Sequence, residues 1–200
     1  MIEALSSLIL TTTLLLGSPG PAPLALAATG AVFGIRGGLP FLGGILTGLL
    51  FVIILAATGI AALFEVFPAS RVLVQVLGGL YILYVAYRIA TAPLVRGSTN
   101  SQNKAPRFKD GFIFNLLNAK AYAAFLALFS QFQLPLDNPL AATAITAIVA
   151  FMVAIAVDIA WLSLGQLLRP VFESPRLARP IRVFFAILML LAVAMMFRSG

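Results

Sequence analysis

The stretch LPFLGGILTGLLFVIILAATGIAAL, which runs from Leu39 to Leu63, contains no charged residue. A helix needs about 20 mostly apolar residues to cross the hydrocarbon core of a bilayer, so this stretch is long enough to span one. A soluble domain would have to hide such a run inside a polar shell, but 62% of the chain is hydrophobic and only 10% is charged. The stretch therefore predicts an integral membrane protein.

Similar apolar runs flank this stretch on both sides, separated by charged residues or by clusters of Pro, Gly and Asn. Taken together they predict an all-α membrane protein with six transmembrane helices, in a single integral membrane domain over residues 1–200. The predicted spans are Leu5 to Ala28, Leu39 to Leu63, Val72 to Ala90, Gly111 to Phe132, Leu140 to Leu168 and Ile181 to Phe197.

The basic residues are distributed unequally between the two sides of these spans. Lys and Arg are retained in the cytoplasm, so the richer side marks the inside and both termini are expected on the outside. Confinement to short connections also argues against a nucleic-acid partner. The richer side carries Arg36, Arg88, Arg96, Lys104, Arg107, Lys109, Arg169, Arg176, Arg179 and Arg182, whereas the other side carries only Arg71 and Arg198.

A polar connection over residues 91–109 divides the chain into halves of about 1–92 and 108–200. A break at Pro19 to Pro21 in the first span recurs about a hundred residues later at Asn118 to Lys120 in the fourth. Three helices per half is an odd number, so a duplicated unit would insert the second time upside down. The sequence thus predicts two inverted three-helix repeats, an arrangement common among secondary transporters.

The chain has no Cys and no His, which removes several kinds of chemistry. Disulfides, thiolate or imidazole metal sites and histidine proton transfer are excluded, so we expect no metal and no cofactor. The zinc-protease motif needs His, and neither a Gly-x-Ser-x-Gly elbow nor an ATP-binding Gly-x-x-x-x-Gly-Lys-Ser/Thr motif occurs, so we expect no enzyme. Proton chemistry, where there is any, must use carboxylates.

Pro19, Gly20 and Pro21 interrupt the first span, and Pro23 follows at once. Proline removes a backbone donor and glycine loosens the chain, so the helix should break here. Broken helices in membranes are tolerated where they are buried or line a watery cavity, and they build substrate sites near the midplane. A packing kink without a role in transport is the alternative interpretation.

Lys120 and Asp158 are charged residues inside the fourth and fifth spans, each roughly 15 Å deep by the helical rise of 1.5 Å per residue. A charge facing lipid is costly, so the two are expected to face each other or a hydrated cavity. They form either a fixed structural ion pair or a site for substrate and protons, with Asp158 as the better proton carrier. Asn115 and Asn118 lie at similar depth and add hydrogen-bonding amides.

With these residues in place, the chain resembles the LysE/RhtB family of amino-acid exporters over nearly its whole length. Pro19-Gly20-Pro21, Gly34-Ile35-Arg36-Gly37-Gly38, Gly78-Gly79-Leu80-Tyr81, Phe108 to Phe112, Asn118-Ala119-Lys120-Ala121 and Gln131-Phe132 match family motifs in order and spacing. The family usually reads Asn-Pro-Lys where this chain has Asn118-Ala119-Lys120, so a weaker kink is expected in the fourth span.

The resemblance implies an inner-membrane exporter of amino acids or related metabolites, driven by the proton-motive force, with a small-molecule substrate and the bilayer as its partners. An ion exporter or channel and a non-transporting assembly factor stay open as alternatives. A homo-oligomer also stays open, because apolar surfaces facing lipid and facing a second copy look alike in a sequence.

Overall fold

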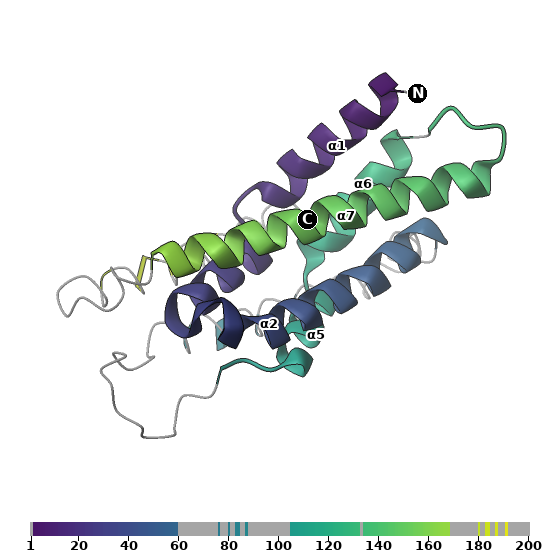
Figure 1. Ribbon diagram of the computed structural model, residues 1–200. Helices are drawn as coiled ribbons and strands as arrows, with labels where there is room; N and C mark the ends of the chain where they lie inside the picture. Colours follow the sequence, from purple (N-terminus) through teal and green to yellow (C-terminus); the bar gives the residue numbers. More distant parts are fainter. Residues whose placement is uncertain are drawn as a thin grey trace.

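The computed structural model describes residues 2–59, 105–132 and 134–168, together with single positions within 76–87 and 180–191. Apart from these single positions, the third and sixth predicted spans, residues 72–90 and 181–197, lie outside the described residues, as does most of the polar connection. Within the described residues every regular element is a helix: α1 (Ile2–Gly17), α2 (Pro21–Ala57), α5 (Phe108–Leu116), α6 (Ala119–Gln131) and α7 (Pro139–Leu167) (Figure 1).

Three of these units are long and apolar enough to cross a membrane. They are α2, α7 and the bent pair formed by α5 and α6. The described part of the chain thus confirms an all-helical membrane protein and contains up to three spans, while the six-helix arrangement remains a prediction.

The first span is broken where the proline cluster predicts it. The helix α1 ends at Gly17 and α2 begins at Pro21, with Gly20 extended between them (φ −169°, ψ −178°). Proline is well suited to the first position of a helix, because its missing N–H has no acceptor there in any case. The cluster therefore starts a second helix instead of kinking a continuous one.

The predicted connection between the first two spans, residues 29–38, contains the kink at which two helices join to form α2, but it is far shorter than expected. Only Gly34 leaves the helical conformation (φ 72°, ψ 175°), and α2 changes direction there (Figure 1). A positive φ favours glycine, which lacks the Cβ that would clash. The N–H of Ile35 donates to Oε1 of Gln166 in α7 over 2.7 Å, so the kink is also closed by a hydrogen bond.

The fourth span breaks as well, although it lacks the family's proline. The helix α5 ends at Leu116, α6 begins at Ala119, and the two are bent by 58°. Kinks above about 20° count as sharp, so this bend is sharp, and whether it is weaker than the bend of relatives with a proline stays a prediction. Asn118 takes an extended conformation at the start of α6 (φ −84°, ψ 91°), which interrupts the helix without a proline.

Glycines allow α2 to touch its neighbours at the backbone. A Cβ on Gly30 would collide with the Leu162 carbonyl of α7, and one on Gly165 with the Ala27 carbonyl of α2. The same relation joins α2 to α5, where Gly44 lies against Phe108 and Gly111 against Phe41. Small residues give helices in lipid this close approach.

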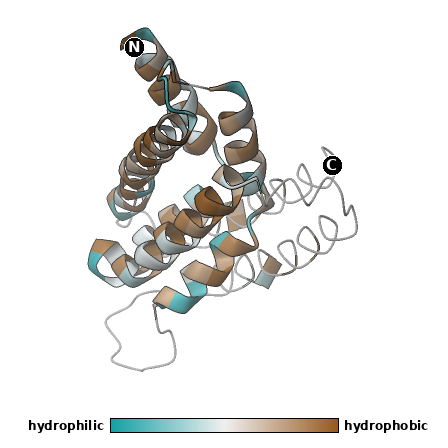
Figure 2. Ribbon diagram, turned by 90° about the vertical axis from the view of Figure 1, so that its right-hand side faces the viewer, coloured by the Kyte–Doolittle hydropathy of each residue, from teal (hydrophilic) through white to brown (hydrophobic). Residues whose placement is uncertain are grey.

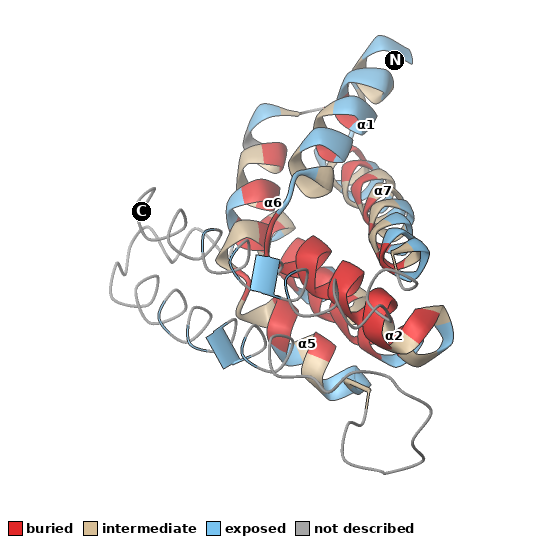
Figure 3. Ribbon diagram, turned by 90° about the vertical axis from the view of Figure 1, so that its left-hand side faces the viewer, coloured by how far each residue is buried: buried red, intermediate tan, exposed pale blue. Residues whose placement is uncertain are grey.

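The first half of α2 is the most buried part of the described structure, and it lies between α7 and α5 (Figure 3). Large apolar side chains cover much of the outside instead, including Leu14 (65% exposed), Ile148 (61%) and Met152 (55%). Brown, hydrophobic residues accordingly dominate the outer faces of the helices (Figure 2). Such a surface suits lipid and not water.

Candidate functional site

The two helix breaks meet through one side chain. The Nζ of Lys120, at the start of α6, donates hydrogen bonds to the backbone oxygen and to Oγ of Ser18, each over 2.8 Å. Gly20 makes room for this side chain, because a Cβ there would lie 2.8 Å from Nζ and 2.9 Å from Cδ of Lys120. A residue of the second half of the chain therefore bonds to the backbone at the helix break of the first half.

Backbone dipoles favour this arrangement. Ser18 lies just past the end of α1, where free carbonyl groups carry partial negative charge that attracts the Lys120 ammonium. The first turn of α2 begins three residues later, and a helix start carries partial positive charge. The break thus places a negative and a positive helix end next to each other.

A small cavity of about 30 Å³ opens beside the breaks. It lies where the two apolar cores meet, since Ala22 belongs to one core and Leu49, Ala121 and Ala154 belong to the other. Its volume suffices for water but not for an amino acid. The residues that line it are Leu16, Ala22, Pro23, Leu49, Asn115, Asn118, Lys120, Ala121, Ala154 and Asp158.

Asp158 lies in this cavity and is only 6% exposed. Among the described residues it forms no ion pair with Lys120, whose ammonium bonds to Ser18 instead. The hypothesis of a fixed structural ion pair is therefore not supported, although both side chains line one cavity as expected. The Asp158 carboxylate is therefore available to a third group, and the Lys120 ammonium, which has three donors, keeps one beyond its two bonds to Ser18.

Two asparagines contribute further unused hydrogen-bonding groups. Nδ2 of Asn118 donates to Oδ1 of Asn115 over 3.4 Å, which leaves Nδ2 of Asn115 and Oδ1 of Asn118 buried without a partner among the described residues. Buried amide groups are nearly always hydrogen-bonded, so a free donor and a free acceptor in one cavity indicate a site for water or a polar solute.

The structure thus brings together four of the residues predicted for the site, Asn115, Asn118, Lys120 and Asp158. Gly20 contacts Lys120, whereas Pro19 is exposed and Pro21 is the buried first residue of α2. Sequence reasoning missed Ser18, the acceptor for Lys120. Its position next to the proline cluster, as a polar residue in an apolar span, was a usable signal.

Gly20→Ala is expected to lower transport severalfold without unfolding the protein. The new methyl group would meet only the far end of the flexible Lys120 side chain, which can move away at little cost in stability but then loses Ser18. The matched control is Gly17→Ala, since nothing lies within 4 Å of a Cβ there. Transport rates and thermal unfolding of both variants check this. Equal transport by both variants would contradict a role of this contact in transport.

Comparison with known proteins gives consistent matches. Residues 13–199 match the family model described as LysE type translocator. A homoserine/homoserine lactone efflux protein of Salmonella typhimurium is 27% identical over 191 residues, 94% of this chain and 93% of that protein, and its Salmonella typhi counterpart matches equally. A leucine efflux protein of Salmonella choleraesuis is 30% identical over 118 residues, 57% of this chain and 56% of that protein. No solved structure matches the chain.

Proposed function

The chain belongs to the LysE type translocator family, and from this premise we propose that it exports amino acids across a bacterial inner membrane. The match over residues 13–199 confirms the resemblance seen in the sequence motifs. The relatives that cover most of the chain are named as efflux proteins for homoserine and its lactone. The apolar helices agree with a multi-pass membrane protein.

The observation that carries the proposal is that a cation and an anion, Lys120 and Asp158, line one cavity without an ion pair between them in the described structure. A free amino acid is a zwitterion, so its carboxylate complements Lys120 and its ammonium group complements Asp158. The free Nδ2 of Asn115 and Oδ1 of Asn118 supply a second donor and acceptor for the same two groups. Charged partners make the stronger hydrogen bonds, so this pair is well suited to select zwitterions.

The rest of the cavity favours an amino acid with a neutral side chain. Leu16, Ala22, Pro23, Leu49, Ala121 and Ala154 make the remaining wall apolar. A basic or acidic side chain would need a further charge of opposite sign, and the described lining residues offer none beyond Lys120 and Asp158. We therefore place neutral amino acids, small polar ones included, ahead of lysine or glutamate as substrates.

The size of the cavity supports a transport cycle that alternates between closed and open states. At about 30 Å³ it must widen before an amino acid enters. Each broken helix packs on a long helix of the other half of the chain, α1 on α7 and α5 on α2. Such crossed packing fits the inverted repeat and a rocking motion of one half against the other. Asp158 is the proposed proton carrier, because it is the carboxylate among the described lining residues.

The test is efflux from proteoliposomes preloaded with radiolabelled homoserine, leucine, lysine or glutamate under an imposed pH gradient. We expect efflux of the neutral amino acids, and we expect Lys120→Met to lower it by about 10- to 100-fold, the value of one charged hydrogen bond. Lys109→Met is the control, because Lys109 is exposed at the start of α5.

Two other outcomes would reject the proposal in different ways. Release of none of the amino acids by correctly inserted protein would favour the ion exporter. Full efflux from Lys120→Met would retain amino-acid export but remove Lys120 from the site.

A further inference from the structure

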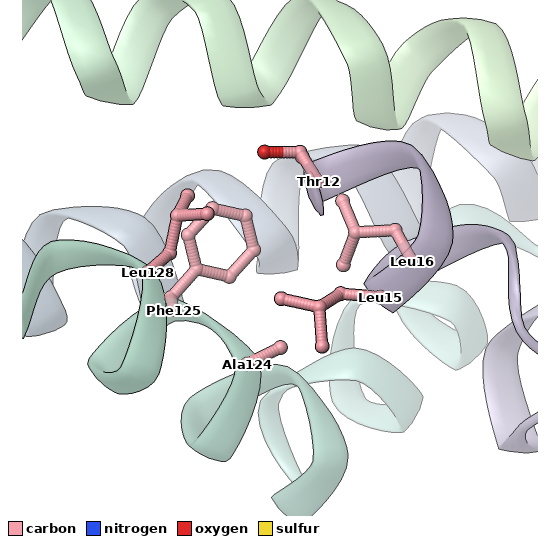
Figure 4. Close-up of a pocket in the computed structure, with 6 residues that line it drawn as sticks. All are labelled: Thr12, Leu15, Leu16, Ala124, Phe125 and Leu128. Atoms are coloured by element: carbon pink, nitrogen blue, oxygen red, sulfur yellow. The ribbon is translucent and has the colours of Figure 1, made fainter. Parts of the chain in front are cut away.

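An apolar crevice lies between α1 and α6, next to the cavity. Thr12, Leu15 and Leu16 of α1 face Ala124, Phe125 and Leu128 of α6 across it (Figure 4). The crevice leaves no room for a water molecule. Leu16 lines both the crevice and the cavity, so this one side chain separates them.

Two threonine hydroxyls, one lining this crevice and one on the buried face of α7, have no partner among the described residues. Oγ1 of Thr12 and Oγ1 of Thr146 have no hydrogen bond in the described structure, and each residue is only 1% exposed. Threonine in a helix usually bonds the carbonyl four residues earlier, as Thr29 does with Ala25 over 2.7 Å and Thr47 with Gly43 over 2.8 Å. Thr12 and Thr146 do not use this local acceptor.

The position of Thr146 connects it to the cavity. It lies on the buried face of α7 between Ala142 and Ala150, which pack in the same core as Leu8 and Leu128. Asp158 lies on this face three turns further along, about 18 Å away by the helical rise, and only alanines stand between them on that face. Small side chains leave space for a solute once the facing helices separate.

Packing gives no reason for these two hydroxyls. An unsatisfied buried hydroxyl costs free energy, and valine would fill nearly the same volume without that cost. The cost is recovered only in a state in which water or a solute reaches the hydroxyls. Both lie on the side of the cavity toward Ile2 and Pro139, the ends of α1 and α7 that the charge distribution predicts to be outside.

We propose that Thr12 and Thr146 line the outer exit path of the transported amino acid, which Leu15, Leu16, Phe125 and Leu128 close in this conformation. When α1 moves away from α6, the crevice opens and the two hydroxyls bond in turn to the polar groups of the departing solute. This inference rests on the proposed export function, but it concerns the route and so has a test of its own.

The absence of native Cys makes the route measurable by thiol labelling. Single variants Thr12→Cys and Thr146→Cys are treated in intact cells with a membrane-impermeant, charged thiol reagent. We expect both cysteines to react. We expect each to react more slowly when it is combined with Lys120→Met, which lowers transport. Ile148→Cys is the matched control, because Ile148 lies two residues from Thr146 on the exposed apolar face and should not react.

The labelling outcomes separate the route from the function. Reaction at Thr12→Cys and Thr146→Cys, with none at Ile148→Cys, supports the exit path even where no tested amino acid is exported. No reaction in cells that still export amino acids overturns the path while the export function stands. Reaction only from the cytoplasmic side also overturns it.

A second pair of variants tests the hydroxyl itself. Thr146→Val should lower the maximal efflux rate about fivefold, the value of one neutral hydrogen bond, while thermal stability stays equal or rises. Thr146→Ser keeps the hydroxyl and should retain the rate. A purely structural threonine would give equal rates for the two variants, which would overturn the proposal.

Discussion

Asp158→Asn is expected to lower pH-driven efflux by about 100-fold while the protein stays folded in the membrane. The substitution keeps the shape of the side chain and removes only its charge. Asp158 is buried, lines the cavity and has no bond to Lys120, so no ion pair among the described residues is lost. Loss of one strong charged hydrogen bond to the substrate ammonium accounts for about 10- to 100-fold, and a lost proton step adds to it.

The control for this variant is Asp137→Asn, the same change at an exposed position in the connection before α7. Two assays separate the roles of Asp158: efflux driven by a pH gradient, and exchange of labelled for unlabelled amino acid without a gradient. Loss of gradient-driven efflux with exchange retained would assign Asp158 to proton coupling. Loss of both would assign it to substrate binding, and retention of both would contradict any role in transport.

Local chemistry made the breaks and charges of the fold predictable from the sequence. The cluster from Pro19 to Pro23 removes backbone donors, and α2 indeed begins at Pro21. The junction at Gly34 was predicted in the right place but as a ten-residue connection, because a single residue of positive φ leaves no trace in hydrophobicity. The angle of the bend before Ala119 was not predictable, because its cause is the conformation of Asn118 and not a proline.

The charged residues of the candidate site were predictable, because a charge inside a span costs free energy unless it lies in a site. Lys120 and Asp158 stand out because charges are rare inside a span, and they do line one cavity. Their partners were not predictable, since Lys120 bonds to Ser18, which is 102 residues away, and Ile35 bonds to Gln166, 131 residues away. Such pairings depend on how the helices cross, which the sequence does not show.

Glycine contacts between α2 and α7 lead to the largest expected effect on stability. Gly30 and Gly165 face opposite backbones, and a Cβ on Gly165 would meet the carbonyl carbon and oxygen of Ala27. A flexible side chain could yield to such a methyl group, but a helix backbone cannot without separating the two helices. Since α2 also carries the first turn that lines the cavity, separation would disturb the site as well.

Gly165→Ala is therefore expected to destabilise the protein by about 3 kcal/mol, the upper range for overpacking, although alanine favours a helix over glycine by up to about 1 kcal/mol. Gly43→Ala in α2 is the control, because its nearest neighbours are ring carbons of Phe108 at 3.7 and 3.9 Å, which is ordinary contact. Its helix preference should then make it neutral or stabilising. Thermal unfolding in detergent measures the stability of both variants. A loss of stability for Gly165→Ala without a loss for Gly43→Ala is expected only if α2 and α7 touch at the backbone. A Gly165→Ala protein as stable as wild type would contradict that contact.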